Sequence, residues 1–125
     1  MSDWLISPPI DRDSDLRIET GLLAQELTAR WPDVRFVERD DAANTMRWAL
    51  KMPNGHDLWA ELHSQGQVIG VDADVYDAAE FARWVRSQVP ESYPLIFWDA
   101  ANEHDVPLTQ DSTVETIAAP FLARR

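Results

Sequence analysis

The stretch TMRWALKMPNGHDLWAELH, residues 45–63, contains two runs of alternating apolar and polar residues around a short turn sequence. Alternation with a period of two is typical of a strand with one buried face. The connection Pro53-Asn54-Gly55 suits a three-residue loop, because Pro fits the second position of a type I turn and Gly fits the left-handed bulge position. The stretch therefore predicts a β-hairpin.

The register that this turn sets agrees with two independent patterns. On one face it forms three apolar cross-strand pairs: Leu50 with Leu58, Trp48 with Ala60, and Met46 with Leu62. On the other face it forms two pairs of opposite charge: Lys51 with Asp57, and Arg47 with Glu61. A two-residue Asn-Gly turn would shift the pairing by one residue and break both patterns. We therefore predict the bulged turn.

The same stretch holds two of the three histidines of the chain, which raises the question of a metal or acid/base site. His56 and His63 are seven positions apart, and an odd separation in a strand sends two side chains to opposite faces. His63 shares the solvent face with Asp57, Trp59 and Glu61, but a flat exposed surface does not form a closed coordination sphere. The hairpin predicts no metal site, and nothing else in the chain predicts a cofactor.

Two further strands extend the hairpin into a meander. Residues 34–40, VRFVERD, precede it, and residues 67–73, QVIGVDA, follow it after a loop at Gln65 and Gly66. That loop sets two more apolar pairs: Leu62 with Ile69, and Ala60 with Val71. Four strands thus follow one another in the chain.

Residues 16–31 predict the first helix, which Pro32 ends. One stripe of this helix is apolar: Leu16, Leu23, Leu27 and Trp31. A second stripe lies roughly opposite: Ile18, Leu22 and Ala29. Two apolar stripes indicate contacts with two surfaces, either within the fold or with a second subunit, so a homodimer stays open.

Residues 74–89 predict the second helix, with Asp74 as its cap and Asp77 in the first turn, where a negative charge suits the helix dipole. Its inward stripe is small and apolar: Ala78, Ala82, Val85 and Val89. Trp84 falls on the opposite side, near Asp77 and Glu80. We expect this tryptophan to be exposed.

The C-terminal part predicts two strands and a third helix. Residues 94–99, PLIFWD, form the most apolar run, and Pro107 in DVPLT favours an edge strand because proline cannot donate to a ladder. Ser112 and Glu115 make a capping box for the helix. Val114, Ile117 and Phe121 are its inward residues, and Pro120 ends or kinks it.

These elements predict one α+β domain over residues 15–125, an antiparallel β-meander sheet with about three helices. The expected order is helix, four strands, helix, two strands, helix. Residues 1–14, with Pro8 and Pro9, are expected to be an extended lead-in. A chain of 125 residues is long enough to bury its own core.

Eleven Lys and Arg against 22 Asp and Glu give a net charge of −11. This charge repels nucleic-acid backbones and anionic lipid head groups, so we expect neither nucleic acid nor membrane as a partner, and a charged partner would be a basic protein. The absence of cysteine fits a reducing compartment, and no leader or apolar run of about 20 residues is present. We therefore expect a cytoplasmic protein.

The sequence contains no nucleophile elbow, phosphate-binding loop, dinucleotide fingerprint or HExxH motif. His104 lies between Glu103 and Asp105, but adjacent residues seldom converge on one reacting atom. We predict that the chain is not an enzyme. A small enzyme of unrecognised type remains as an alternative, which would require a deep pocket containing His63 or His104.

The element order, the small size and the acidity resemble the fold of class I type III secretion chaperones, which is similar to that of several bacterial toxin-immunity proteins. The stretch FARWVRSQVPESYPLIFWD, residues 81–99, is similar to small bacterial proteins associated with immunity. The resemblance implies a non-enzymatic protein binder, which is often dimeric among the chaperones.

The leading hypothesis is an immunity or inhibitor protein that neutralises a basic bacterial toxin domain. The alternative is a secretion chaperone that binds an effector segment. The residues expected to bind the partner are acidic or aromatic, with one histidine: Trp59, His63, Asp72, Asp74, Asp77, Glu80 and Trp84. Aromatic residues beside charges are enriched at protein interfaces.

Overall fold

The computed structural model describes residues 2–101 and 104–122 and confirms an α+β fold. The elements follow in this order: β1 (Trp4–Ser7), α1 (Thr20–Arg30), β2 (Arg35–Asp40), β3 (Thr45–Lys51), β4 (Asp57–His63), the short 3-10 turn η1 (Ser64–Gly66), β5 (Val68–Asp72), α2 (Val75–Gln88), β6 (Leu95–Asp99), β7 (Asp105–Leu108) and α3 (Val114–Leu122). From α1 onward this is the predicted order, and one additional strand precedes it.

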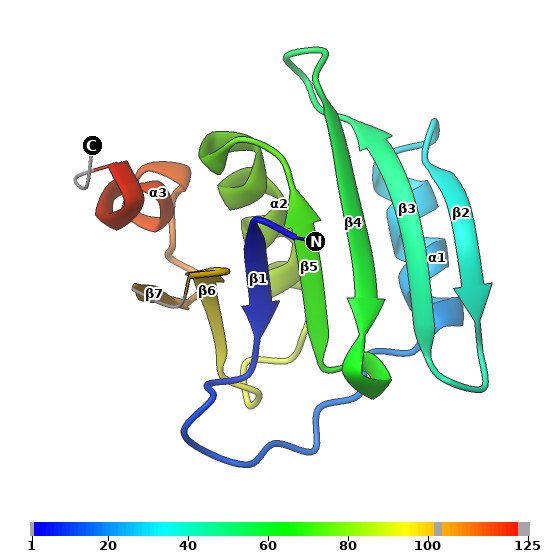
Figure 1. Cartoon of the computed structure of the whole chain (residues 1–125), viewed down its shortest axis with the longest axis horizontal. Coiled ribbons are helices and arrows are strands. Elements are labelled where there is room, and N and C mark those ends of the chain that lie inside the picture. The colour runs from blue at the N-terminus through cyan, green and yellow to red at the C-terminus, as the bar shows by residue number, and fades with distance from the viewer. Residues whose placement is uncertain (1, 102–103, 123–125) are drawn as a thin grey trace.

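The seven strands of the described residues form one antiparallel sheet in the order β2-β3-β4-β5-β1-β6-β7. The helices lie on one side of this sheet, and its other face points toward the reader in Figure 1 without a helix over it. β7 is an edge strand, as Pro107 predicted. The molecule therefore has a helical side, which contains the core, and an uncovered sheet face.

The expectation of an extended lead-in over residues 1–14 is corrected by β1, which lies inside the sheet between β5 and β6. Trp4 faces the helical side, where its ring stacks on Phe97 at 5.5 Å. Only four residues form this strand, and Pro8 follows directly, so the local pattern is too short to identify it. β1 separates β5 from β6, and α2 connects these two strands across it.

The hairpin of residues 45–63 has the predicted register. Leu50 pairs with Leu58, and Lys51 pairs with Asp57. Gly55 adopts φ +89°, the left-handed conformation that the bulged turn requires. The predicted pairs between β4 and β5 are also present, including Leu62 with Ile69.

The core fills the space between the sheet and the helices. Its largest fully buried side chains come from both layers: Trp48, Phe81, Phe97, Ile6, Leu27, Met46, Leu50, Leu58, Leu62, Ile69, Ile117 and Val71. The four residues of the first predicted stripe of α1 and the four of the predicted stripe of α2 are buried too. Helical periodicity thus identified the inward faces correctly.

Two predicted helix starts are wrong. α1 begins at Thr20, so Leu16 is buried but belongs to the segment before the helix. The capping box of α3 is one residue further along than expected: the hydroxyl of Thr113 accepts a hydrogen bond from the Thr116 amide at 3.1 Å, and the Thr116 hydroxyl accepts one from the Thr113 amide at 2.9 Å. Threonine can take both roles of the box because its hydroxyl both donates and accepts.

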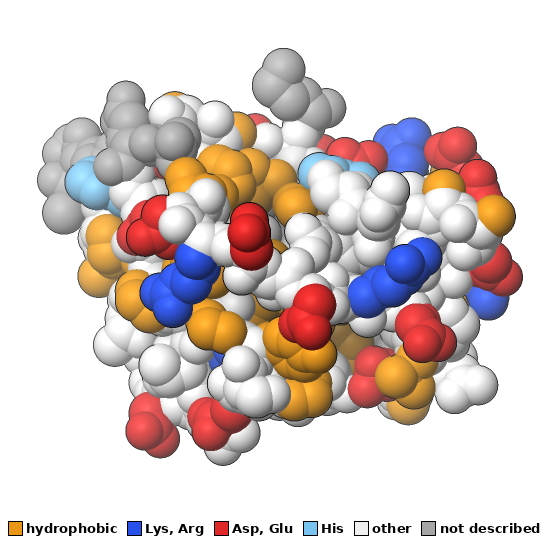
Figure 2. All heavy atoms as spheres, turned by 90° about the horizontal axis from the view of Figure 1, so that it is seen from below, with side chains coloured by type: hydrophobic (Ala, Val, Ile, Leu, Met, Phe, Trp, Pro, Cys, Tyr) orange, Lys and Arg blue, Asp and Glu red, His pale blue; other side chains and the backbone are white. Residues whose placement is uncertain are grey.

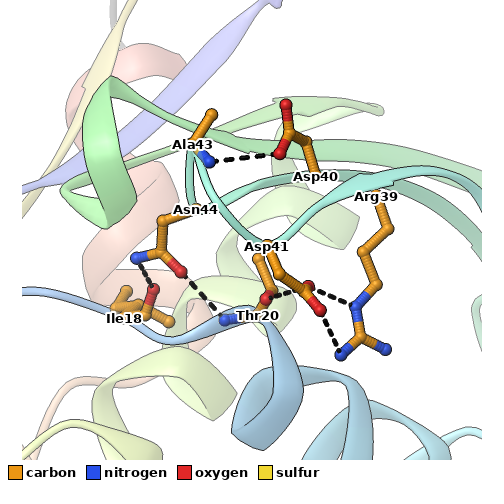
Figure 3. Close-up of polar contacts among 7 residues, drawn as sticks. All are labelled: Ile18, Thr20, Arg39, Asp40, Asp41, Ala43 and Asn44. Atoms are coloured by element: carbon orange, nitrogen blue, oxygen red, sulfur yellow. Dashed lines mark hydrogen bonds and ion pairs between the residues drawn. The ribbon is translucent and has the colours of Figure 1, made fainter.

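The start of α1 is capped by a residue from another element. The Asn44 side chain, in the turn between β2 and β3, accepts a hydrogen bond from the Thr20 amide at 3.1 Å and donates one to the Ile18 carbonyl at 2.6 Å (Figure 3). The Asp41 carboxylate accepts from the Thr20 hydroxyl at 2.6 Å and from Arg39 Nε at 2.7 Å. This group of contacts, which we call the Asn44 tie, attaches the turn to α1.

Candidate functional site

The seven predicted binding residues do not share one surface. Trp59, 40% exposed, pairs directly with Asp72 on the uncovered sheet face, and His63 lies on the same face beside Ser64. Asp72 has a structural contact there, because its carboxylate accepts the Asp3 amide at 2.9 Å. Trp59, His63 and Asp72 thus lie on one face of the sheet.

The other predicted residues belong to α2 and its cap. Asp74 is exposed, whereas Asp77 is buried, with 6% of its surface accessible. The expectation of an exposed Trp84 is wrong: it is half-buried, and its ring lies 5.1 Å from that of Trp31. Because α2 covers the helical side, Glu80 and Trp84 cannot form one face with Asp72.

A groove of about 430 Å³ contains Glu80 and Trp84, at the junction of α1, α2 and the segment after β7. Its other charged lining residues are three arginines: Arg30, Arg83 and Arg86. Guanidinium groups therefore outnumber carboxylates in this groove. It does not suit the basic partner that the acidic composition favours.

A second groove, which we call the α1–α2 groove, has a volume of about 180 Å³. It is lined by the segment before α1, the first half of α1, the end of α2 and one residue of β5. These residues are Leu16, Arg17, Ile18, Glu19, Leu22, Leu23, Glu26, Ile69, Trp84, Val85, Gln88, Val89 and Pro90. Figure 2 shows hydrophobic side chains gathered at this lower end of the molecule, with single carboxylates among them. The groove is thus apolar with a charged rim.

Two residues of α1 give this groove its chemical character. Leu22 is 57% exposed, so the second stripe predicted for this helix is partly unburied in the single chain. Glu26 lies beside it, and burial raises the pKa of its carboxyl above the ordinary value of 4.5. An apolar side chain and a partly desolvated carboxylate therefore border the same groove.

A third group of side chains joins the turn between β3 and β4 to the first turn of α2. His56 Nδ1 lies 3.5 Å from an Asp74 carboxylate oxygen and 3.4 Å from Asp77 Oδ2. Figure 1 shows this turn and the start of α2 at the same end of the sheet. We call His56, Asp74 and Asp77 the His56 cluster.

Neighbouring groups hold each member of the His56 cluster in place. Asp74 caps α2 as predicted, with its Oδ1 accepting the Asp77 amide at 2.9 Å. Asn54 donates to Asp77 Oδ1 at 2.8 Å and accepts the His56 amide at 2.9 Å. Each carboxylate thus uses Oδ1 for a structural hydrogen bond and turns Oδ2 toward the imidazole.

Sequence reasoning correctly separated His56 from His63 but missed the partners of His56. Asp74 and Asp77 were identified as a cap and a first-turn residue, some 18 and 21 positions beyond the histidine. No local pattern places a hairpin turn against a later helix. The sequence offered one indirect signal. The turn precedes β4 and α2 follows β5, and because β4 and β5 are antiparallel, the turn and the start of α2 lie at the same end of the sheet.

The third histidine, His104, is exposed and lies 6.3 Å from the Phe121 ring. Glu103, the residue before it in the sequence, lies outside the described residues. His63 ends β4, whereas His104 directly precedes β7. His63 Nδ1 lies 3.1 Å from the hydroxyl of Ser64, an exposed residue that is its direct neighbour in the sequence.

Comparison with known proteins gives no relative: no family model, no curated protein and no solved structure matches this chain. Within the part of the chain that the structure describes, the helices are too short or too polar to cross a bilayer.

Proposed function

We propose that this chain is a non-catalytic protein-binding protein of the cytoplasm, most consistent with an immunity or inhibitor protein that neutralises a basic protein domain. The observation that carries the proposal is the α1–α2 groove, in which exposed Leu22 adjoins the partly desolvated carboxylate of Glu26. A partner side chain that is apolar at its base and cationic at its tip, such as Lys or Arg, complements both features.

Electrostatics supports a basic partner in two ways. A net charge of −11 attracts a basic surface at long range and speeds association at low ionic strength. At short range, a cation beside Glu26 would stabilise the charged carboxylate and so offset the cost of its desolvation, which raises the pKa of this group. Arg17 also lines the groove and would repel a cation near it. The partner's cation would therefore lie beside the carboxylates of Glu19 and Glu26.

A second candidate, a chaperone for an extended segment, is supported by edge strand β2. All six of its residues are exposed, including Phe36 at 39% and Val37 at 55%. An exposed edge presents unpaired backbone groups on which an extended peptide can add a strand. This mode would use backbone hydrogen bonds and depend little on salt.

The two candidates can be separated with one partner and three variants. The partner is captured from the native cell and identified, and its dissociation constant is then measured at low and high salt. Neutralisation through the α1–α2 groove predicts that Leu22→Ser and Glu26→Gln each weaken binding about tenfold or more and that high salt weakens the wild type. Val37→Ser, the matched control on β2, should leave binding unchanged.

The opposite pattern would replace the proposal. Loss of binding in Val37→Ser, with Leu22→Ser and Glu26→Gln unaffected, would assign the chain to the chaperone candidate. Binding that is indifferent to salt and to all three substitutions would refute both surfaces.

A further inference from the structure

We propose that the His56 cluster is a binding site for a divalent transition-metal ion, with Zn²⁺ as the best fit. The cluster offers one imidazole nitrogen and two carboxylate oxygens that all lie within 4.8 Å of one another. The inference does not depend on the proposed function, because the cluster lies at the opposite end of α2 from the α1–α2 groove.

The distances from the imidazole nitrogen to the two carboxylate oxygens fit one shared ion. Two ligands bound at about 2.0–2.1 Å to a tetrahedral ion lie roughly 3.4 Å apart. His56 Nδ1 lies 3.4 Å from the Asp77 oxygen and 3.5 Å from the Asp74 oxygen. The imidazole therefore already stands at the separation that common coordination requires.

A protonated His56 placed between two carboxylates is the simpler alternative. Charge-assisted hydrogen bonds between nitrogen and a carboxylate are typically about 2.7–2.9 Å long. The two separations in the cluster, 3.4 and 3.5 Å, both lie well above this range. The two nitrogen–oxygen distances therefore match the spacing of two ligands on one metal ion better than the length of two hydrogen bonds.

Asp77 supplies an independent observation. Its side chain is 92% buried, and buried polar atoms normally have a hydrogen-bond partner. The Oδ2 atom nevertheless has none among the described residues. The positive end of α2 explains why carboxylates occur here, and the cap explains the Oδ1 atoms, but neither provides a donor for this oxygen. A metal ion would satisfy it.

The surroundings organise the cluster in the way that metal sites require. Asn54 fixes the Asp77 carboxylate from one side and the His56 backbone from the other, and Asp74 Oδ1 is held by the α2 backbone. Such outer contacts orient ligands before the ion binds. The free positions of the ion would be taken by water, since His56 and Asp74 are 65% and 49% exposed.

The donor set selects the class of ion. Ca²⁺ prefers six to eight oxygen ligands, whereas one imidazole with two carboxylates suits Zn²⁺ and similar first-row ions. The bound ion would join the turn between β3 and β4 to the start of α2. Binding only to the folded chain would also raise its thermal stability.

The test uses the full chain after removal of metal with a chelator. Titration calorimetry with Zn²⁺ measures affinity and stoichiometry, and Co²⁺ provides visible absorption bands that report tetrahedral coordination. We expect one ion per chain, at least tenfold weaker binding in His56→Ala and Asp77→Asn, and about tenfold weaker binding in Asn54→Ala. His63→Ala, which changes the other hairpin histidine, is the matched control and should bind as the wild type does.

Three outcomes would overturn the inference: no saturable binding by the wild type, unchanged affinity in His56→Ala, or equal losses in His56→Ala and His63→Ala. Because the His56 side chain is exposed, His56→Ala should keep the unfolding temperature of the metal-free chain, which separates a lost ligand from a lost fold.

Discussion

At each end of β3, an asparagine side chain connects a turn to the start of a helix, but the two asparagines differ in burial and in what their partners leave unpaired. At one end, Asn44 connects the turn between β2 and β3 to the start of α1, and at the other end Asn54 connects the turn between β3 and β4 to the first turn of α2. Asn44 is 4% exposed and its amide contacts protein groups on both sides. Asn54 is exposed, and the carboxylate that it holds keeps one buried oxygen unpaired.

This difference separates a structural contact from a candidate site. The Asn44 tie provides partners for the backbone at the start of α1, and both ends of the Asn44 amide are already paired with protein groups. The His56 cluster is equally well positioned but incomplete, because its free oxygens converge on an exposed imidazole. Hydrogen-bonded asparagine thus stabilises the fold at one end and orders possible ligands at the other.

We expect the largest change in the free energy of unfolding from substitution at one of two glycines that share the same backbone conformation. Gly66 and Gly55 both have φ +89°, but a Cβ on Gly66 would meet the Asn44 amide and the Ile18 carbonyl, whereas a Cβ on Gly55 meets nothing within 4 Å. We expect Gly66→Ala to lower the free energy of unfolding by roughly 3–5 kcal/mol and Gly55→Ala by about 1–2 kcal/mol. Urea denaturation measures both, and equal losses would contradict the crowding at Gly66.

The next effect compares the two asparagines. Asn44→Ala leaves the buried Thr20 amide and Ile18 carbonyl without partners, so we expect a loss of roughly 2–4 kcal/mol in the free energy of unfolding. Asn54 is itself exposed, but its removal takes the hydrogen bond from one oxygen of the buried Asp77 carboxylate, so we expect a smaller loss of about 1–2 kcal/mol. Chemical denaturation of the metal-free chain measures both losses. A larger loss in Asn54→Ala than in Asn44→Ala would contradict the prediction.

The smallest effect is a pH dependence of opposite sign at two carboxyls. Hydrogen bonds from Arg39 and Thr20 lower the pKa of Asp41, so its contribution is present above the ordinary value of 3.8 and is lost as the pH falls through the folded-state pKa. Asp41→Asn should therefore lower the unfolding temperature at neutral pH and have little effect in acid.

Burial raises the pKa of Glu26, so its contribution is favourable below 4.5 and is lost as the pH rises through the folded-state pKa. Glu26→Gln should slightly raise the unfolding temperature at neutral pH and leave it unchanged in acid. Thermal scans across this pH range test the two variants together. A shift of the same sign in both would show that the assigned causes are incorrect.

Much of the fold could be predicted because its signals are local. The bulged turn at Gly55 and the paired charges beside it fixed the register of β3 and β4, since a slip of one residue exchanges the faces of a strand. β1 could not be predicted in this way. Its four residues carry little periodic information, and their position inside the sheet depends on β5 and β6, which lie far along the chain.

The candidate sites divide in the same manner. The sequence identified Asp74 as a cap and Leu22 as a residue outside the main stripe of α1. It could not show that Asp77 is buried or that Trp84 packs on Trp31, because both depend on how α2 meets its neighbours.

Local sequence patterns are enough to predict the α+β class, the hairpin register, the inward faces of the helices and the acidic composition, because alternation, helical periodicity and charge are properties of near neighbours. Three features appear only in the folded chain: β1 lies within the sheet, Asn44 caps α1, and His56 meets Asp74 and Asp77. Those contacts join segments whose separation along the chain carries no periodic signal. They exist because compact packing of the core places turns and helix ends side by side.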